Sequence, residues 1–181
     1  MLTNDEAWEV LRSAERLVCA EVISAALDRL AGEISARLAA TNPVVVTVMG
    51  GAVVFSGHIL PLLRFPLEFD FLHVSRYGER TRGGEIEWKV WPRTPLAGRT
   101  VLVLDDILDE GITLAAIRDG LLARGASAVY SAVFADKDIG KAKPVFADFV
   151  GVRLPNRYVF GFGMDVRGAW RNLPEIYALK P

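Results

Sequence analysis

The sequence predicts an α/β fold with a mainly parallel, twisted sheet that is flanked by helices on both faces. Short apolar segments rich in β-branched residues alternate along the chain with segments of helical periodicity. This alternation is typical of parallel strands joined by crossover helices. The 181 residues contain no internal repeat, low-complexity stretch or interdomain linker. Since this length suits one domain with a sizeable core, we expect a single domain over residues 1–181.

The N-terminal segment, residues 1–41, is expected to be helical and to pack on that domain. Thr3 and Glu6 have the spacing of a capping box, and apolar residues then recur at helical intervals until an Asn-Pro pair ends the pattern. Cys19 is the only cysteine and falls within this pattern. It cannot form an internal disulfide, and we expect a buried, unreactive thiol.

The other elements follow from changes in periodicity. Continuous apolar runs predict strands covered on both faces, whereas strict alternation predicts strands with one solvent-exposed face. A polar, glycine-containing stretch at 75–84 is too long for a tight turn, which indicates either a solvated excursion or a functional flap. We expect strands at 44–48, about 67–71, 86–90, 101–104, 128–135, 149–154 and 158–160, and helices at about 53–63 and 113–124.

Composition argues against several classes of function. Lys and Arg number 21 against 22 for Asp and Glu, so no global basic field exists to attract nucleic acid. The first residues lack the basic start and apolar stretch of a signal peptide, and no run approaches the ~18 apolar residues of a membrane span. We therefore expect a cytoplasmic protein that binds neither nucleic acid nor membrane and captures anions locally.

One strand-to-helix junction, with the sequence VLVLDDILDEGITL, carries the main candidate site residues. Ligands of open parallel sheets bind beyond the carboxyl ends of strands, where loops meet helix N-termini. Here an apolar strand delivers Asp105, Asp106 and Asp109, and Gly111 and Thr113 follow at a helix start. Free amides of a helix start can hold a phosphate, and acids can hold a divalent cation or ribose hydroxyls. Taken alone, the three acids could instead be helix-capping and solvated loop residues.

The same junction resembles the motif by which type I phosphoribosyltransferases bind phosphoribosyl pyrophosphate (PRPP). In that family two acids end a strand, and an Asp-x-Gly-x-Thr loop holds the ribose 5′-phosphate. The resemblance implies that Asp105 and Asp106 orient the ribose hydroxyls, and it also implies a flexible hairpin loop and a small hood. The implied phosphate loop consists of Asp109, Glu110, Gly111, Ile112 and Thr113.

From about Val44 to Leu173, the chain resembles the hypoxanthine-guanine branch of this family. Gly50 and Gly51 match the turn that binds pyrophosphate through its main chain, and Arg171 matches a pyrophosphate-binding arginine. The start of the mobile loop that covers the reacting centre is matched by Ser75, Arg76 and Tyr77.

The resemblance also implies a purine site. Lys137 matches the lysine that donates to the exocyclic oxygen of the base, Tyr158 the aromatic residue that stacks on it, and Val159 the neighbour whose backbone reads it. Because a lysine can only donate, it suits hypoxanthine, guanine or xanthine and not the amino group of adenine. Taken alone, Lys137 could form a surface ion pair with Asp136, and Tyr158 could be a half-buried strand aromatic.

The implied function is transfer of the phosphoribosyl group of PRPP to a 6-oxopurine with Mg²⁺, in purine salvage. Asp109 is implied as the general base that accepts the purine's ring proton. Asp165 is implied as the ligand of one Mg²⁺, with Asp105 and Asp106 near another. The family also implies a homodimer or homotetramer. A xanthine-preferring enzyme, a PRPP or nucleotide sensor and a structural domain with a vestigial pocket stay open, although joint retention of Asp109, Lys137 and Asp165 favours an enzyme.

Several residues depart from the family pattern or have no expected role. Gly50 stands where many members carry a lysine, and Glu110 where a threonine is common, which places a carboxylate beside the phosphate. Ile112 removes a polar option from the same loop, and Arg76 replaces a small serine. No function is assigned to His58 or His73, and we expect Trp88 and Trp91 to pack inside the protein or against another subunit.

Overall fold

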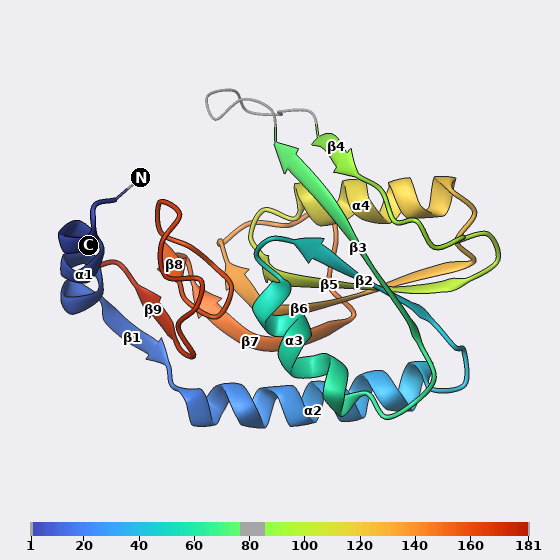
Figure 1. Cartoon of the computed structure of the whole chain (residues 1–181), viewed down its shortest axis with the longest axis horizontal. Coiled ribbons are helices and arrows are strands. Elements are labelled where there is room, and N and C mark those ends of the chain that lie inside the picture. The colour runs from blue at the N-terminus through green and yellow to red at the C-terminus, as the bar shows by residue number, and fades with distance from the viewer. Residues whose placement is uncertain (1, 77–85, 181) are drawn as a thin grey trace.

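The computed structural model of the chain describes residues 2–76 and 86–180, which form two sheets (Figure 1). The larger sheet has six strands in the order β4-β3-β2-β5-β6-β7, and its neighbouring strands are parallel except for the antiparallel pair β3 and β4. The expected α/β fold with a mainly parallel sheet is therefore confirmed. Its strands are β2 (Val44–Met49), β3 (Glu68–Arg76), β4 (Ile86–Val90), β5 (Thr100–Leu108), β6 (Ala128–Asp138) and β7 (Phe149–Pro155).

Helices cover both faces of this sheet, as the alternating pattern predicts. Leu102 and Leu104 of β5 are buried with the helices on one face, whereas Val101 and Val103 are buried with the helix on the other. This double burial explains why the strand reads as a continuous apolar run. The first face is covered by α2 (Ala20–Leu38) and α3 (Val53–Ile59), which continues into the 3₁₀ turn η1 (Leu60–Leu62), and the second by α4 (Ile112–Ala123).

A smaller antiparallel sheet forms a hood at one end of the molecule (Figure 1). Its strand order is β1-β9-β8, and the segment between β8 and β9 carries Asp165 and Arg171. Both residues line the same cavity as the carboxyl end of β5, so the hood faces the candidate site. The hood strands are β1 (Glu15–Val18), β8 (Val159–Phe160) and β9 (Ile176–Ala178).

The expectation of a continuous helical segment over residues 1–41 is wrong. The capping box of Thr3 and Glu6 is present, but helix α1 (Asn4–Ser13) ends before β1, and a second helix begins only at Ala20. The segment between them pairs with β9 near the other end of the chain, and no local pattern could indicate that partner. Cys19 lies between β1 and α2 and is only partly buried, not fully buried as expected.

Two central strands are longer than their apolar runs. Strand β5 continues through Asp105 and Asp106 to Leu108, and β6 continues through Lys137, because the parallel pairing of the two strands extends this far. Both strands therefore continue past their apolar runs. The polar side chains in these extensions face the candidate site and not the hydrophobic core. Of the expected mobile loop, Ser75 and Arg76 belong to β3, and Tyr77 lies outside the described residues.

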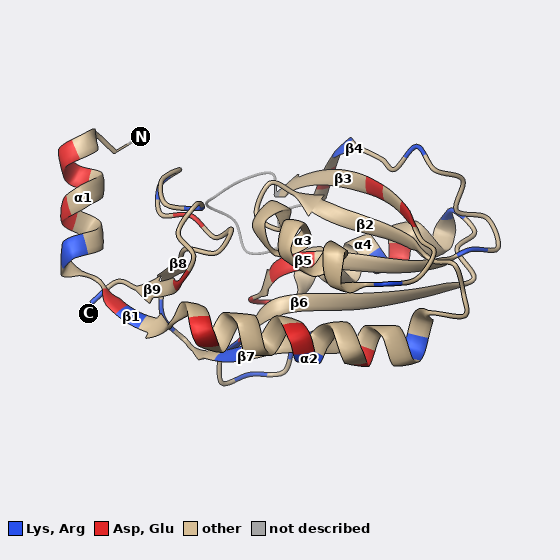
Figure 2. Ribbon diagram, turned by 60° about the horizontal axis from the view of Figure 1, so that its bottom comes forward, with Lys and Arg blue, Asp and Glu red and all other residues tan. Residues whose placement is uncertain are grey.

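Trp88 and Trp91 pack inside the described part of the chain, which confirms one of the two expectations for them. Their rings stack with centroids 3.4 Å apart, and the guanidinium of Arg124 lies 3.7 Å from the Trp91 ring centroid. Acidic and basic residues are interspersed along the elements, as Figure 2 shows. Among the described helices, none combines the length and apolar character that crossing a membrane requires.

Candidate active site

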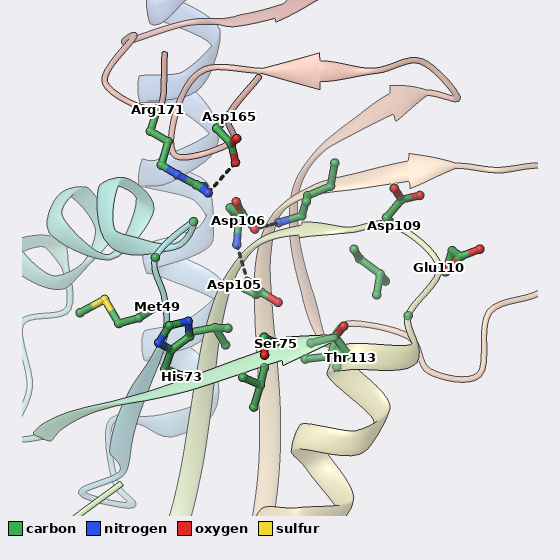
Figure 3. Close-up of a pocket in the computed structure, with 18 residues that line it drawn as sticks. Met49, His73, Ser75, Asp105, Asp106, Asp109, Glu110, Thr113, Asp165 and Arg171 are labelled. Carbon is green, nitrogen blue, oxygen red and sulfur yellow. Dashed lines mark hydrogen bonds and ion pairs between the residues drawn. The ribbon is translucent and has the colours of Figure 1, made fainter. Parts of the chain in front are cut away.

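A cavity of about 590 Å³ opens at the carboxyl ends of the central strands, and Figure 3 shows the side chains around it. Such a position is where open parallel sheets bind ligands. Four parts of the chain meet there: the turn after β2, the end of β3, the junction from β5 into α4, and the hood segment that follows β8. The lining includes Gly50, Gly51, His73, Ser75, Asp105, Asp106, Asp109, Glu110, Gly111, Thr113, Asp165 and Arg171.

Asp105 and Asp106 form a pair of adjacent carboxylates that water hardly reaches. Asp105 is 9% exposed, and burial raises its pKa well above the ordinary value, as does the neighbouring charge of Asp106. Burial also raises the pKa of Asp106, against the lowering effect of hydrogen bonds from Asp105 and Ile107 and of the Arg171 charge. A cation or hydroxyl donors brought by a ligand would offset this repulsion.

The capping explanation for these acids is wrong. Helix α4 has Gly111 as its N-cap, and no side chain forms a cap hydrogen bond there. Asp105 and Asp106 stand within β5, and each accepts a hydrogen bond from the backbone N–H of the following residue, at 3.0 and 2.8 Å. Asp109 is engaged by Lys137. The three acids therefore gather at the cavity for a reason other than helix capping.

The turn after β2 is packed closely on one side and open on the other. A Cβ at Gly51 would overlap the carboxylate of Asp106, and a Cβ at Gly163 would overlap the carbonyl of Gly51. A side chain at Gly163 would meet backbone, whereas one at Gly51 would require the Asp106 carboxylate to move. Around Gly50, by contrast, the described residues leave open space where a Cβ would lie. A longer side chain would fit at Gly50, so its absence removes a functional group and not a packing contact.

Arg171 and Asp165 form a connected pair on the hood side of the cavity. Nη2 of Arg171 lies 2.5 Å from Oδ1 of Asp165, and Nη1 donates to the carbonyl oxygen of Gly163 at 2.6 Å. The other oxygen of Asp165 accepts a hydrogen bond from the N–H of Gly168 at 2.6 Å. Arg171 is therefore fixed at the cavity wall and is not an isolated surface charge.

Lys137 and Asp109 meet at the ends of neighbouring strands. Leu108, the last residue of β5, is in register with Asp136 of β6, so Asp109, which follows β5, stands beside Lys137. The ammonium of Lys137 lies 2.8 Å from Oδ2 of Asp109, and its side chain is only 11% exposed. The surface pair of Lys137 with Asp136 is wrong, because Asp136 pairs with Lys143 instead.

A second cavity of about 230 Å³ lies beside the first. Lys137, Tyr158 and Val159 line it, and Tyr158 is 53% exposed and lies directly before β8. Its hydroxyl donates to the backbone oxygen of Asp165 at 3.3 Å. Residues common to both cavities are Asp106, Ile107, Asp109, Asp165 and Arg171. The two cavities therefore share a wall and can hold two parts of one reacting complex.

The loop between β5 and α4 has the features of an anion site at a helix start. Gly111 has a φ of +82°, which favours glycine, and α4 begins directly after it at Ile112. Thr113 lines the larger cavity from the first turn, and Ile112 is exposed. In Figure 3 the Glu110 side chain points away from Asp105. Its carboxylate lies 3.7 Å from the ammonium of Lys141, which partly offsets the negative charge.

Comparison with known proteins identifies the family. Residues 13–167 match the phosphoribosyl transferase domain family. This chain belongs to the phosphoribosyltransferase family. It is 33% identical over 166 residues to the hypoxanthine-guanine phosphoribosyltransferase of Bacillus subtilis, with 91% of this chain and 92% of that protein covered. The expected family and its hypoxanthine-guanine branch are confirmed.

Two further comparisons support the same family. The chain is 36% identical to the bifunctional protein TilS/HprT of Listeria innocua over 91% of its own length, but it spans only 26% of that longer protein. The crystal structure of a hypoxanthine phosphoribosyltransferase from Staphylococcus aureus superimposes with a TM-score of 0.88 at 28% identity, and 94% of each chain is covered.

Lys143 lies outside both cavities but supports the strand ends that form them, and sequence reasoning missed it. Its ammonium donates to the carbonyl oxygens of Leu108 and Lys137, both at 2.7 Å, and to Oδ1 of Asp136 at 2.6 Å. The side chain is 8% exposed. Three acceptors from two strand ends therefore use all three donors of one buried lysine. No sequence signal distinguishes it from the exposed Lys141, because its acceptors come together only in the fold.

The three buried hydrogen bonds of Lys143 predict a large loss of stability in Lys143→Met. That variant leaves the Asp136 carboxylate and two carbonyls without their buried partner, and the free energy of unfolding should fall by about 3–5 kcal/mol. Urea unfolding would measure it, with Lys141→Met as the matched control. The latter removes an exposed ammonium and should cost less than about 1 kcal/mol. Similar losses in both variants would contradict a stabilising role for the buried hydrogen bonds of Lys143.

The repulsion between Asp105 and Asp106 predicts that Asp105→Asn stabilises the ligand-free protein. At neutral pH the free energy of unfolding should rise by about 1 kcal/mol or more, since one buried charge is removed while an acceptor oxygen remains. The pKa of Asp105 is higher in the folded than in the unfolded state, where it is about 3.9. The wild type therefore loses stability as pH rises above that value, and the advantage of the variant should disappear below about pH 4.

Urea unfolding of wild type and Asp105→Asn at about pH 7.5 and about pH 4 tests this expectation. Asp119→Asn, an exposed substitution on α4, is the matched control. A gain that stayed constant across this pH range would show that the two buried carboxylates do not cause it.

Proposed function

We propose that the chain transfers the phosphoribosyl group of PRPP to hypoxanthine or guanine, giving the nucleoside monophosphate and pyrophosphate in purine salvage. The observation that supports this proposal most strongly is the Lys137–Asp109 pair, which lies where the two cavities adjoin. One cavity has carboxylates and a helix start for a phosphorylated sugar, and the other has an exposed aromatic ring beside a donor. Hypoxanthine-guanine phosphoribosyltransferases among the relatives support the same reaction.

PRPP would lie in the larger cavity. Its 5′-phosphate would bind the loop from Asp109 to Thr113, where the amides and the positive end of the α4 dipole favour an anion. Asp105 and Asp106 would accept hydrogen bonds from the ribose hydroxyls. The main chain of the Gly50–Gly51 turn and the guanidinium of Arg171 would bind the pyrophosphate.

The purine would lie in the smaller cavity, stacked on Tyr158 and read by the backbone of Val159. Lys137 would donate to the 6-oxo group, while Asp109 would accept the ring proton that leaves as the ring nitrogen attacks the ribose. In the ligand-free structure these two side chains bond to each other. Binding of the base thus exchanges one ion pair for two contacts with the purine, so neither charged group is left without a partner.

The residues of the site fit Mg²⁺. Its preferred ligands are carboxylate and phosphate oxygens, and two adjacent carboxylates with raised pKa values gain from a nearby cation. No group of three or more acidic, His or Cys side chains in the described residues could hold a metal alone. Asp165 would hold one ion together with substrate oxygens, and Asp105 and Asp106 would lie near another. The bound ion would offset the negative charge that develops on pyrophosphate as it leaves.

The oligomeric state and the cytoplasmic location stay predictions. Strand β3 pairs with β4 only from His73 onward, and the rings of Phe69 and Phe71 are exposed on the unpaired part. An exposed apolar face of this kind supports assembly into a homodimer or homotetramer, because a second subunit would remove it from water.

A panel of bases tests the proposed reaction. Release of pyrophosphate from PRPP in the presence of magnesium should occur with hypoxanthine and guanine, but not with adenine, because Lys137 can only donate. Xanthine belongs in the panel, since it carries the same 6-oxo group. Folded protein that is silent with every base would contradict the reaction, and release with adenine would contradict the role of Lys137.

The variant Asp109→Asn tests the general base. It keeps the size of the side chain and an acceptor for Lys137, but an amide does not take up the purine's proton. Turnover should fall by about 10²–10⁴, while the KM for PRPP changes much less. Asp138→Asn, which removes an exposed carboxylate at the end of β6, is the matched control and should keep its turnover. Unchanged turnover in Asp109→Asn would refute the assignment.

A further inference from the structure

Helix α1 stands apart from the main sheet but contacts the hood segment that carries Asp165 and Arg171 (Figure 1). The rings of Trp8 and Trp170 meet edge to face, with centroids 4.9 Å apart and planes at 68°. Nε1 of Trp170 also donates to the carbonyl oxygen of Ala7 at 2.8 Å, across 163 positions of the chain. Two independent contacts therefore fix the indole of Trp170 to α1.

The backbone next to Arg171 needs such support. Trp170 has a φ of +71° and Arg167 a φ of +50°, in the left-handed region that disfavours residues other than glycine. Such conformations persist when surrounding contacts hold them. Within the segment, backbone bonding between Val166 and Ala169 supplies part of this support. The contacts of Trp170 with α1 supply more, immediately before Arg171.

The opposite side of the same segment lies against the turn after β2. Arg171 bonds to Asp165 and to the carbonyl of Gly163, and the N–H of Gly163 donates to the carbonyl of Arg171 at 2.9 Å. Gly163 in turn approaches the carbonyl of Gly51 too closely to allow a Cβ. The hood segment is thus held between α1 on its outer side and the proposed pyrophosphate turn on its inner side.

We propose that α1 is a positioning element for the pyrophosphate side of the active site, acting through Trp8 and Trp170 on Arg171 and Asp165. This inference rests on the proposed function, and it adds residues outside both cavities, since neither tryptophan lines them. Trp8 and Trp170 are positioning residues. Their loss leaves Lys137 in place, because this lysine lies on β6 of the main sheet and not in the hood segment.

The test compares Trp8→Ala with wild type by calorimetric titration of PRPP with Mg²⁺ and by steady-state kinetics. Loss of one aromatic contact should raise the Kd and KM for PRPP about threefold to tenfold. The kcat and the KM for hypoxanthine should change less than about twofold. Trp8→Phe keeps a ring at this position and should restore most of the affinity for PRPP.

Two more variants sharpen the test. Trp170→Phe keeps the ring but removes the N–H that bonds to Ala7, so it should also weaken PRPP binding. Val22→Ala is the matched control, because Val22 on α2 is 49% exposed against 46% for Trp8 and lies on another helix. Its affinity for PRPP should equal that of wild type.

The outcomes separate this inference from the proposed function. If folded wild type does not bind PRPP, the proposed function fails. If wild type binds PRPP but Trp8→Ala binds it equally well and only melts at a lower temperature, α1 has a purely structural role and the positioning inference is overturned. A loss of PRPP affinity that Trp8→Phe reverses, at unchanged kcat, supports it.

Discussion

The parallel register between β5 and β6 is the constraint on which the site depends. Leu108 lies opposite Asp136, so the residues that follow them, Asp109 and Lys137, lie side by side and form an ion pair. Lys143 holds this arrangement by bonding to both strand ends. A shift of one residue between the strands would separate the two side chains. The base site is therefore a consequence of sheet pairing, which the buried core of both strands fixes.

Local patterns predicted the parts of the fold and site that depend on local chemistry. The runs that became β2 and the first half of β5 are buried on both faces, and Gly111 starts α4 where the motif placed it. What could not be predicted depends on distant partners. Strand β1 exists because β9 pairs with it, and Lys143 is buried because separate strand ends supply its acceptors. The predicted end of β5 at residue 104 is wrong for a related reason. Asp105 is polar, which indicates a strand end, but β5 continues through it while its side chain faces a cavity.

Adjacent buried carboxylates show that the ligand-free site is not arranged for stability alone. Burial raises the pKa of both Asp105 and Asp106, and the charge of Asp106 raises the pKa of Asp105 further. Gly51 adds a second restriction, since a side chain at this position would displace the carboxylate of Asp106. These features disfavour the empty state and favour a complex in which hydroxyl donors and a cation surround the acids. Binding energy is thereby directed to the part of the substrate that reacts.

The open space at Gly50 explains why the position of Arg171 matters in this chain. In the proposed complex the turn at Gly50 faces pyrophosphate, and a lysine there, as many members of the family carry, would bring a cation to it. The described neighbours leave open space where the Cβ of such a residue would lie. Arg171 is the only lysine or arginine among the described residues that line the larger cavity. In the proposed complex, more of the charge on pyrophosphate would then be met by this one guanidinium and by Mg²⁺. Arg171 follows a residue with left-handed backbone, Trp170, which α1 holds from outside, so we expect these contacts to affect the binding of PRPP.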